Sequence, residues 1–550
     1  MSDEIFEIFC LPDEILMNII GFIVNSNNLA LSCKRFYQLV CYSTRNSIPL
    51  ELTCADIDDE DIFKSVMNSS RQFIDLTINL KYSAVLENST YEKIISILKK
   101  YGDSLEIFKI WSSIQSKPVE MNESQLYNIF SHIPNTYDCT LRNIVITQND
   151  EIYKEKELNL YKMKKLVLDY CMINSASIFN KIPSNVIHDL VFTFEPYDER
   201  NFQEFFYRQS KIVKLELYEN DKINFAHLQL EHIKISSNID YKVMIEQQPN
   251  LQYIDFAIAW VNEVTFVEVC KLKNLQVLKT LIDLISCKTF KHLQNLISLK
   301  ELRLDSHSSH DMGYLQELSM MRGMQLEKLT LLLNERKISP EVILQFANNF
   351  HYLKQIELIN RSINIIVTII QNLPNLETIL LDFFAVFGAP DDILTLEISD
   401  ESNKFPNIKQ LIVTNVNVNE EENGRNLLKL VSLCPNIQKL MLSKIIKFSN
   451  EELRSILMSH ANLSHFSLET DDTEFGGETV EMIFEYGKNL KHFRLAGIKN
   501  CLPYKVLKEI FSEKFPILNT YKYCTGDIEV VMKKKRIKDW YLEFKLMDHF

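Results

Sequence analysis

Glycine is scarce in this sequence, with only 11 among 550 residues. Nucleotide enzymes need closely spaced glycines where the backbone approaches a phosphate, and neither Gly-x-Gly-x-x-Gly nor Gly-x-x-x-x-Gly-Lys-Ser/Thr occurs. No serine, cysteine or histidine lies in a recognisable nucleophile motif either. We therefore expect a protein that is not an enzyme and has no cofactor.

Paired cysteines and long apolar runs are also missing. The 11 cysteines are an odd number and form no Cys-x-x-Cys pair, which argues against a disulfide framework and against zinc. No apolar run approaches the roughly 18 residues needed to cross a bilayer, and the first residues are acidic. We expect a protein of a reducing compartment, the cytoplasm or the nucleus, without membrane contact.

One histidine-rich stretch invites a metal interpretation, namely His307-Ser308-Ser309-His310-Asp311. Neither a third ligand nor a recurrent ligand spacing accompanies it. We expect an exposed polar loop and no metal site.

The net charge of −13 would repel the phosphates of nucleic acids, so nucleic acid is not an expected partner. The basic run Lys533-Lys534-Lys535-Arg536 is the one exception to the acidic balance. It has two interpretations, a nuclear-import signal or, more commonly, the solvated face of a helix.

The sequence does contain a repeat. The pattern apolar-x-x-apolar-x-apolar recurs from Phe73 to Leu518, about 26 residues apart on average, which is the spacing of leucine-rich repeats. Clear copies begin at Leu299, Ile437 and Leu490, and an early copy is assigned to Leu141. The last two apolar positions of each copy point to one side of a short strand, so the residues between them face the other side.

Helical segments alternate with these strands. Leu453, Ile456 and Leu457 keep helical spacing, Ser339 before Pro340 is typical of a helix start, and several Pro-Asn pairs end a helix before the next strand. We predict an α/β fold, a leucine-rich-repeat solenoid in which a curved parallel sheet is lined by outer helices. The position that usually carries asparagine or cysteine varies, so we expect the backbone hydrogen bonds normally supported there to be satisfied differently.

Two helical phrases precede the repeats. Leu11-Pro12-Asp13-Glu14 is typical of a helix start, and the following apolar residues cover more than one face of that helix. A second phrase runs from Leu29 to Tyr37. A short helix that is apolar on several faces needs burial on several sides, which a partner protein could provide. The alternative is a pair of capping helices that cover the end of the solenoid.

These phrases, in this order and at the head of a repeat region, resemble an F-box over about residues 8 to 45. The F-box is the helical module that docks a substrate receptor onto the Skp-type adaptor of a cullin-RING ubiquitin ligase. The resemblance implies a small all-α module before the solenoid, and an adaptor-binding set of Leu11, Pro12, Glu14, Ile15, Leu16, Ile19, Leu29, Leu31, Cys33, Lys34 and Phe36.

The resemblance and the repeats together suggest four parts. They are an F-box at 1–48, irregular N-terminal leucine-rich repeats at 49–160, the main solenoid at 161–524 and a C-terminal capping segment at 525–550.

The exposed strand positions would form the concave face, where solenoids usually recognise partners. A loop rich in phenylalanine after the strand near Leu376 could anchor a peptide, or its side chains could pack locally, which is the commoner outcome. For any single charged residue on the face, solvated surface is also the commoner interpretation. The candidate substrate-binding residues are Glu301, Arg303, Asp305, Phe383, Phe384, His465, His492 and Arg494.

The resemblance implies a non-catalytic substrate-recognition subunit. Its partners would be the Skp-type adaptor, through it a cullin and a RING subunit, and a protein substrate whose identity the sequence does not reveal. The alternative is a leucine-rich-repeat scaffold or sensor that binds proteins without delivering them for ubiquitination.

Overall fold

The structure, a computed structural model, divides into two compact units, Met1–Ala259 and Trp260–Phe550. Each unit is described by itself below. The structure describes Leu16 and residues 49–80, 86–114, 117–148, 156–193, 198–218, 224–236, 241–306, 313–333, 339–360, 368–382, 405–414, 428–443, 450–469, 482, 485–487, 489–496, 520–525, 528–536 and 539–546.

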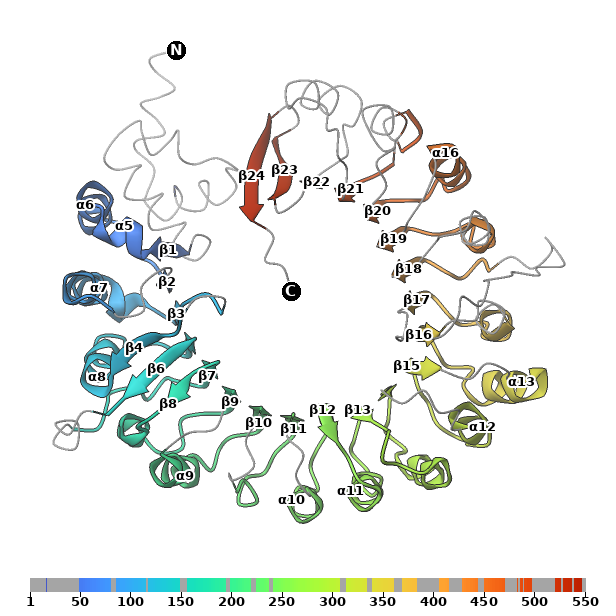
Figure 1. Ribbon diagram of the computed structural model, residues 1–550, viewed down its shortest axis with the longest axis horizontal. Helices are drawn as coiled ribbons and strands as arrows, with labels where there is room; N and C mark the ends of the chain where they lie inside the picture. The colour runs from blue at the N-terminus through green and yellow to red at the C-terminus, as the bar shows by residue number, and fades with distance from the viewer. Residues whose placement is uncertain are drawn as a thin grey trace. The chain divides into compact units, whose positions relative to one another are not determined.

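The first unit alternates strands with helices or turns (Figure 1). Its elements are β1 (Leu50–Thr53), α5 (Cys54–Asp58), α6 (Glu60–Asn68), β2 (Asp75–Asn79), α7 (Asn88–Tyr101), η1 (Gly102–Ser104), β3 (Ile107–Trp111), β4 (Val119–Asn122), α8 (Glu123–Ser131), β5 (Asp138–Arg142), β6 (Ile144–Thr147), β7 (Lys165–Asp169), β8 (Met172–Ile173), η3 (Ser177–Lys181), β9 (Asp189–Thr193), α9 (Glu199–Arg208), β10 (Lys214–Tyr218), β11 (His232–Ile235), α10 (Lys242–Glu246) and β12 (Tyr253–Trp260).

The second unit continues the same alternation. Its elements are α11 (Glu263–Val269), β13 (Val277–Leu281), η4 (Cys287–Asn295), β14 (Glu301–Asp305), α12 (Tyr314–Ser319), β15 (Lys328–Leu333), α13 (Pro340–Asn349), β16 (Gln355–Asn360), β17 (Thr378–Asp382), β18 (Gln410–Thr414), β19 (Lys439–Ser443), α16 (Asn450–Ser459), β20 (His465–Glu469), β21 (His492–Ala496), β22 (Thr520–Thr525), β23 (Ile528–Arg536) and β24 (Asp539–Leu546).

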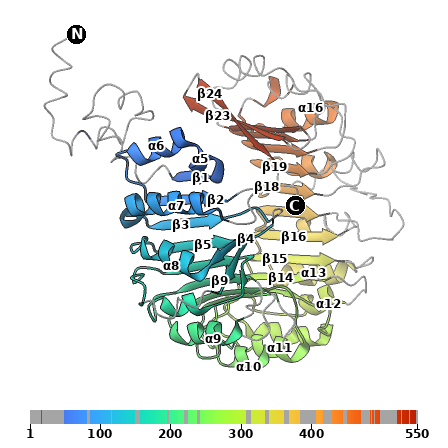
Figure 2. The same ribbon diagram turned by 60° about the vertical axis from the view of Figure 1, so that its left-hand side comes forward.

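Both units are built on parallel strands that follow one another in chain order. In the first unit the parallel series runs β1, β2, β3, β5, β7, β9, β10, β11 and β12. In the second it runs from β13 to β22, and Figure 2 shows β14, β15 and β16 stacked in this order. The strands β23 and β24 then pair antiparallel.

Alternate strand residues are buried. The pattern partly exposed, buried, partly exposed, buried, partly exposed recurs in β2, β14, β17, β19 and β20. In both units the helices lie on one side of the strands (Figure 1). The buried side chains fill the layer between strand and helix, and we call the opposite side the open face. This arrangement is the predicted α/β repeat solenoid.

Most strands of the parallel series start with the same backbone hydrogen bonds. The carbonyl of the residue before such a strand accepts two N–H groups from the next repeat. The Gln276 carbonyl, for example, accepts from Lys300 N at 2.8 Å and from Glu301 N at 3.0 Å. The Lys300 carbonyl accepts in the same way from Glu327 and Lys328. Each repeat is therefore registered on its neighbour by main-chain atoms that every sequence supplies.

One early repeat lies elsewhere than predicted. The copy assigned to Leu141, with Ile144 and Ile146 as its strand positions, is wrong, because Ile144–Thr147 is strand β6 of a separate small sheet with β4 and β8. The main-sheet strand is β5, with Cys139 and Leu141 buried. Asn143 between β5 and β6 has φ 55°, a left-handed turn that lets the chain leave one sheet for the other.

Helix starts follow their sequence signals. Ser339 caps α13 by accepting from Val342 N, with proline in the first turn, as predicted. Leu453, Ile456 and Leu457 are buried in α16, which confirms the helical spacing.

Two predictions concern the ends of the chain. The basic run Lys533-Lys534-Lys535-Arg536 lies in strand β23, so its interpretation as a helix face is wrong. The predicted F-box module lies outside the described residues except for Leu16, which is helical and 1% exposed. The four predicted parts of the chain stay predictions.

Asparagines bind successive repeats together at the turn before the strand. Asn375 donates from Nδ2 to the His351 carbonyl at 2.8 Å, Asn407 to Pro374 at 2.6 Å and Asn436 to Pro406 at 2.9 Å. Asn135 and Asn489 make the equivalent bonds to Asp103 and Ala461. These side chains belong largely to the Pro-Asn pairs, so the expectation that the backbone is supported at another place is confirmed for these repeats.

We predict that Asn407→Ala lowers the free energy of unfolding by about 0.5–1 kcal/mol, because the Pro374 carbonyl loses its donor. Urea unfolding would measure the loss, and amide hydrogen exchange should rise in β17 and β18. Asn274→Ala is the matched control: Asn274 also directly precedes a buried repeat residue, Leu275, but has no side-chain hydrogen bond among the described residues. Its cost should stay within about 0.5 kcal/mol. Equal losses in both variants would contradict the role assigned to these asparagines.

Candidate functional site

The open face presents a regular grid of polar side chains. In strands such as β14, β19 and β20 the first, third and fifth residues point to this face, because the second and fourth are buried. Strand pairing aligns these positions into rows that run across the strands. Polar groups from many repeats are thereby held at fixed spacing on a rigid sheet, which suits recognition of another macromolecule better than catalysis.

In the first unit, charges on the open face are largely paired. Lys165 lies 3.2 Å from Asp138, and Arg142 lies 3.0 Å from Asp169. Asp189 lies next to Lys165 in the register. Burial raises the pKa of Asp189, although Lys165 and Lys214 oppose that shift.

The end of this face in the first unit carries aromatic side chains. The rings of His232 and Tyr253 stack with centroids 3.8 Å apart, and the Tyr253 hydroxyl donates to Asp255 Oδ2 at 3.2 Å. Lys234 lies over the Tyr218 ring, 5.2 Å from its centroid. Aromatic and cationic groups held in this way can contact a partner without large losses of side-chain entropy.

The predicted residues Glu301, Arg303 and Asp305 lie side by side on β14 and face the open side. Each takes part in an ion pair. Glu301 lies 3.0 Å from Lys328 on β15 and 3.8 Å from Lys279 on β13, and Arg303 Nε lies 2.7 Å from Asp305. A partner would have to compete with these pairs to use the charges.

The predicted residues His465, His492 and Arg494 come together on β20 and β21. His465 and His492 are register partners, and their rings stack at 4.3 Å between centroids. Burial lowers the pKa of His465, and the nearby His492, Lys439 and Lys491 lower it further. The sequence identified these residues without indicating that the two histidine rings meet.

Other predicted site residues lie outside the described part of the chain. They are Phe383, Phe384 and all members of the adaptor-binding set except Leu16. The stretch His307-Ser308-Ser309-His310-Asp311 lies outside it as well. The roles assigned to these residues stay predictions.

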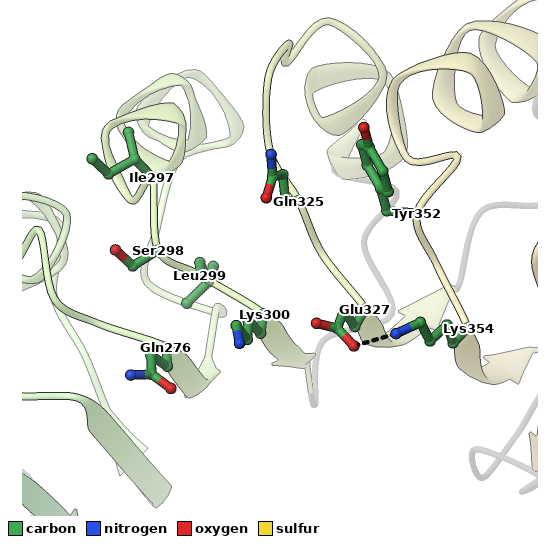
Figure 3. Close-up of a pocket in the computed structure, with 9 residues that line it drawn as sticks. All are labelled: Gln276, Ile297, Ser298, Leu299, Lys300, Gln325, Glu327, Tyr352 and Lys354. Atoms are coloured by element: carbon green, nitrogen blue, oxygen red, sulfur yellow. Dashed lines mark hydrogen bonds and ion pairs between the residues drawn. The ribbon is translucent and has the colours of Figure 1, made fainter.

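Two pockets lie at the turns before the strands, at positions that the sequence did not single out. In the second unit a pocket of about 370 Å³ is lined by charged and amide side chains of the residues just before β13 to β16. Figure 3 shows Glu327 joined to Lys354, 2.8 Å apart, with Tyr352 above them. In the first unit a pocket of about 710 Å³ includes Glu106, Tyr137 and Lys164 at the equivalent repeat position. The sequence signal that could have indicated these pockets is the polar residue that recurs directly before many of the strands.

In the pocket of the second unit, the charged side chains of Glu327 and Lys354 form an ion pair with each other. This pairing lowers the pKa of Glu327 and raises that of Lys354. Within the described ranges, no group of three or more histidine, cysteine or acidic residues could hold a metal ion. No helix among these same ranges is both long and apolar enough to cross a membrane.

The described cysteines are free thiols. Burial raises the pKa of Cys270 and Cys434 to about 12, so each thiol stays protonated at neutral pH. The thiolate is the nucleophile in cysteine chemistry, so these two residues are suited to packing rather than to catalysis.

Comparison with known proteins yields little beyond the structure itself. No protein-family model matches the chain, and no curated protein matches it. Among solved structures, an internalin (inlF) from Listeria monocytogenes is similar, with 13% sequence identity, 72% of this chain and 81% of that chain covered, and a TM-score of 0.23. The α/β repeat solenoid therefore rests on the strand pairing and the burial pattern of this chain.

We predict that His492→Gln raises the pKa of His465 toward its ordinary value, because the stacked ring of His492 and its electrostatic effect on His465 are removed together. A pH titration followed by NMR of labelled histidine rings would measure the change. His351→Gln is the control, since the ring of His351 contacts that of Tyr352 at a tilted angle rather than His465, and it should leave the titration of His465 unchanged.

The lowered pKa of His465 also affects the stability of the folded protein. Because the folded state favours the neutral form of His465, the contribution of this residue to the free energy of unfolding is fully present above its pKa in the unfolded chain. That contribution is lost as the pH falls through its pKa in the folded protein. His492→Gln should weaken this loss. An unchanged titration of His465 in His492→Gln would show that the two rings do not influence each other.

Proposed function

We propose that this protein is a non-catalytic substrate-recognition subunit of an SCF-type cullin-RING ubiquitin ligase. The N-terminal helices would dock the Skp-type adaptor, and the solenoid would bind the protein target. A cullin and a RING subunit would join through the adaptor, and the protein would work in the cytoplasm or the nucleus. Neither nucleic acid nor a membrane is a partner in this proposal.

The proposal is carried by the position of the F-box-like phrases directly before a repeat solenoid. Leu11-Pro12-Asp13-Glu14 and Cys33-Lys34-Arg35-Phe36 precede β1, the first strand of the described series, by only a short stretch of chain. An adaptor-binding module attached to a long protein-binding surface is what a substrate receptor requires.

Such a receptor needs no active site of its own. Holding a target near the transfer enzyme raises the effective concentration of the target lysine, which accelerates transfer without new chemistry in this chain. The paired charges and buried thiols described above fit this role, because they stabilise or present a surface rather than poise a nucleophile.

The alternative is a scaffold or sensor that binds proteins through the open face without delivering them for ubiquitination. It rests on the same solenoid and needs no adaptor. The two functions differ in one measurable way: targets of a receptor accumulate when the protein is depleted, whereas partners of a scaffold keep their abundance.

We predict that the native chain co-purifies with a Skp-type adaptor and that the double variant Leu11→Ala, Pro12→Ala loses at least about ten-fold in adaptor affinity, because an apolar contact and the start of the helix are both removed. Pull-down followed by quantitative mass spectrometry would measure it. Ile297→Ala, which changes a side chain 68% exposed in the second unit, is the control and should bind the adaptor normally. Absence of adaptor from the native protein would refute the receptor function and leave the scaffold.

A further inference from the structure

Strands β19 to β21 of the second unit carry a group of basic side chains. We call Lys439, His465, Lys491, His492 and Arg494 the basic corner. Lys439, His465 and His492 align in one row across β19, β20 and β21, and Arg494 follows His492 at the next position that faces the same side. Lys491 directly precedes His492 and lies close enough to influence His465.

Among the described residues, the first two rows of this part of the open face carry no acidic side chain. Along the first two rows of β17 to β21, the positions are Thr378, Leu380, Gln410, Ile412, Lys439, Met441, His465, Ser467, His492 and Arg494. The acid nearest in register is Glu469, in the third row, and its carboxylate accepts a 2.5 Å hydrogen bond from Ser443. Among the described residues, Lys439, Lys491 and Arg494 have no ion-pair partner. Arg494 Nε is buried there without a hydrogen-bond partner.

The contrast with the start of the same unit is informative. On β13 to β15 the cations Lys279, Lys328 and Arg303 all lie within 4 Å of a carboxylate, at 3.8, 3.0 and 2.7 Å. Lys328 belongs to the same row as Lys439, through Gln355, Thr378 and Gln410. In this one row, Lys328 is therefore paired with a carboxylate, whereas Lys439 has no ion-pair partner among the described residues.

We propose that the basic corner binds an anionic segment of a partner protein, with carboxylates or a phosphate seated on Lys439, His492 and Arg494. The proposal rests on the proposed function in that the open face of the solenoid binds a protein. It specifies which part of that face binds the partner, and that the segment bound there is negatively charged.

The chemistry of the side chains favours such a segment. An arginine guanidinium suits the paired oxygens of a carboxylate or a phosphate, and lysine adds a flexible charge. Adjacent strands are about 4.8 Å apart, so Lys439 on β19 and Arg494 on β21 match charges a few residues apart on an extended peptide. The net charge of −13 disfavours a nucleic acid, whose phosphates would also meet the acidic remainder of the molecule.

The test uses the full-length protein without adaptor and four fluorescent probes. Two are octapeptides, one with four consecutive glutamates and one with a single phosphoserine. The third is a matched octapeptide with four glutamines, and the fourth is a single-stranded oligonucleotide of eight thymidines. Fluorescence anisotropy at 50 mM and 200 mM salt measures affinity. We expect at least one anionic peptide to bind at least about ten-fold more tightly than the glutamine peptide, and to weaken with salt.

Two variants place the binding at the basic corner. The double variant Lys439→Gln, Arg494→Gln should bind the anionic peptide with an affinity at least about ten-fold lower. Lys328→Gln, which removes a neutralised lysine from the same row, should leave affinity within about two-fold. Thermal unfolding checks that both variants are folded. Because Arg494 is partly buried, Lys439→Gln alone is the second variant and should weaken binding by several-fold.

Several outcomes overturn the proposal. They are no preference for either anionic peptide, an equal loss in Lys328→Gln, and tighter binding of the oligonucleotide than of both peptides. Comparing the glutamate and phosphoserine peptides identifies the source of the charge, and either one binding supports the proposal. Adaptor docking is absent from this experiment, so failure of the F-box prediction and failure of the basic corner give different results.

Discussion

The structure depends on one backbone interaction that most of its described repeats share. The carbonyl of the residue before a main-sheet strand accepts two N–H groups from the following repeat, as Gln276 does from Lys300 and Glu301. Because these are main-chain atoms, the interaction tolerates any side chain, and successive side chains at this position are free to be glutamate, lysine, glutamine or tyrosine. A repeat protein with little residue-level consensus can therefore keep an exact parallel register.

Side chains reinforce this backbone order at two levels. Alternate strand residues such as Leu440 and Leu442 are fully buried under the helices, so a slip by one residue would expose the apolar side of the strand. Asparagines such as Asn407 and Asn436 then fasten one turn to the carbonyl of the preceding turn. Among the few glycines, Gly102 has a clear structural reason, since a Cβ atom there would lie 1.7 Å from the carbonyl oxygen of His132 in the next repeat.

This rigidity is what makes the open face a candidate binding surface. A charge on one strand keeps a fixed distance from charges on its neighbours, so local charge balance is a property of the fold. The face therefore differs from place to place within one unit: Arg303 is neutralised by Asp305, whereas Arg494 has no such partner among the described residues. A partner whose charges complement the unpaired cations would be selected by electrostatic complementarity more than by the size of the buried interface.

The sequence by itself determined the repeat, the strand alternation and the helix start at Ser339, because apolar spacing and capping residues report local structure directly. It misplaced the repeat at Leu141, where Ile144 and Ile146 imitate the strand pattern while belonging to a second small sheet. It also listed His465, His492 and Arg494 only as separate exposed positions. Only the tertiary structure decided that the rings of His465 and His492 meet, and that Glu301 lies between two lysines from neighbouring strands. The physical reason is that strand register joins residues about 26 positions apart, and charge pairing depends on that register rather than on neighbours along the chain.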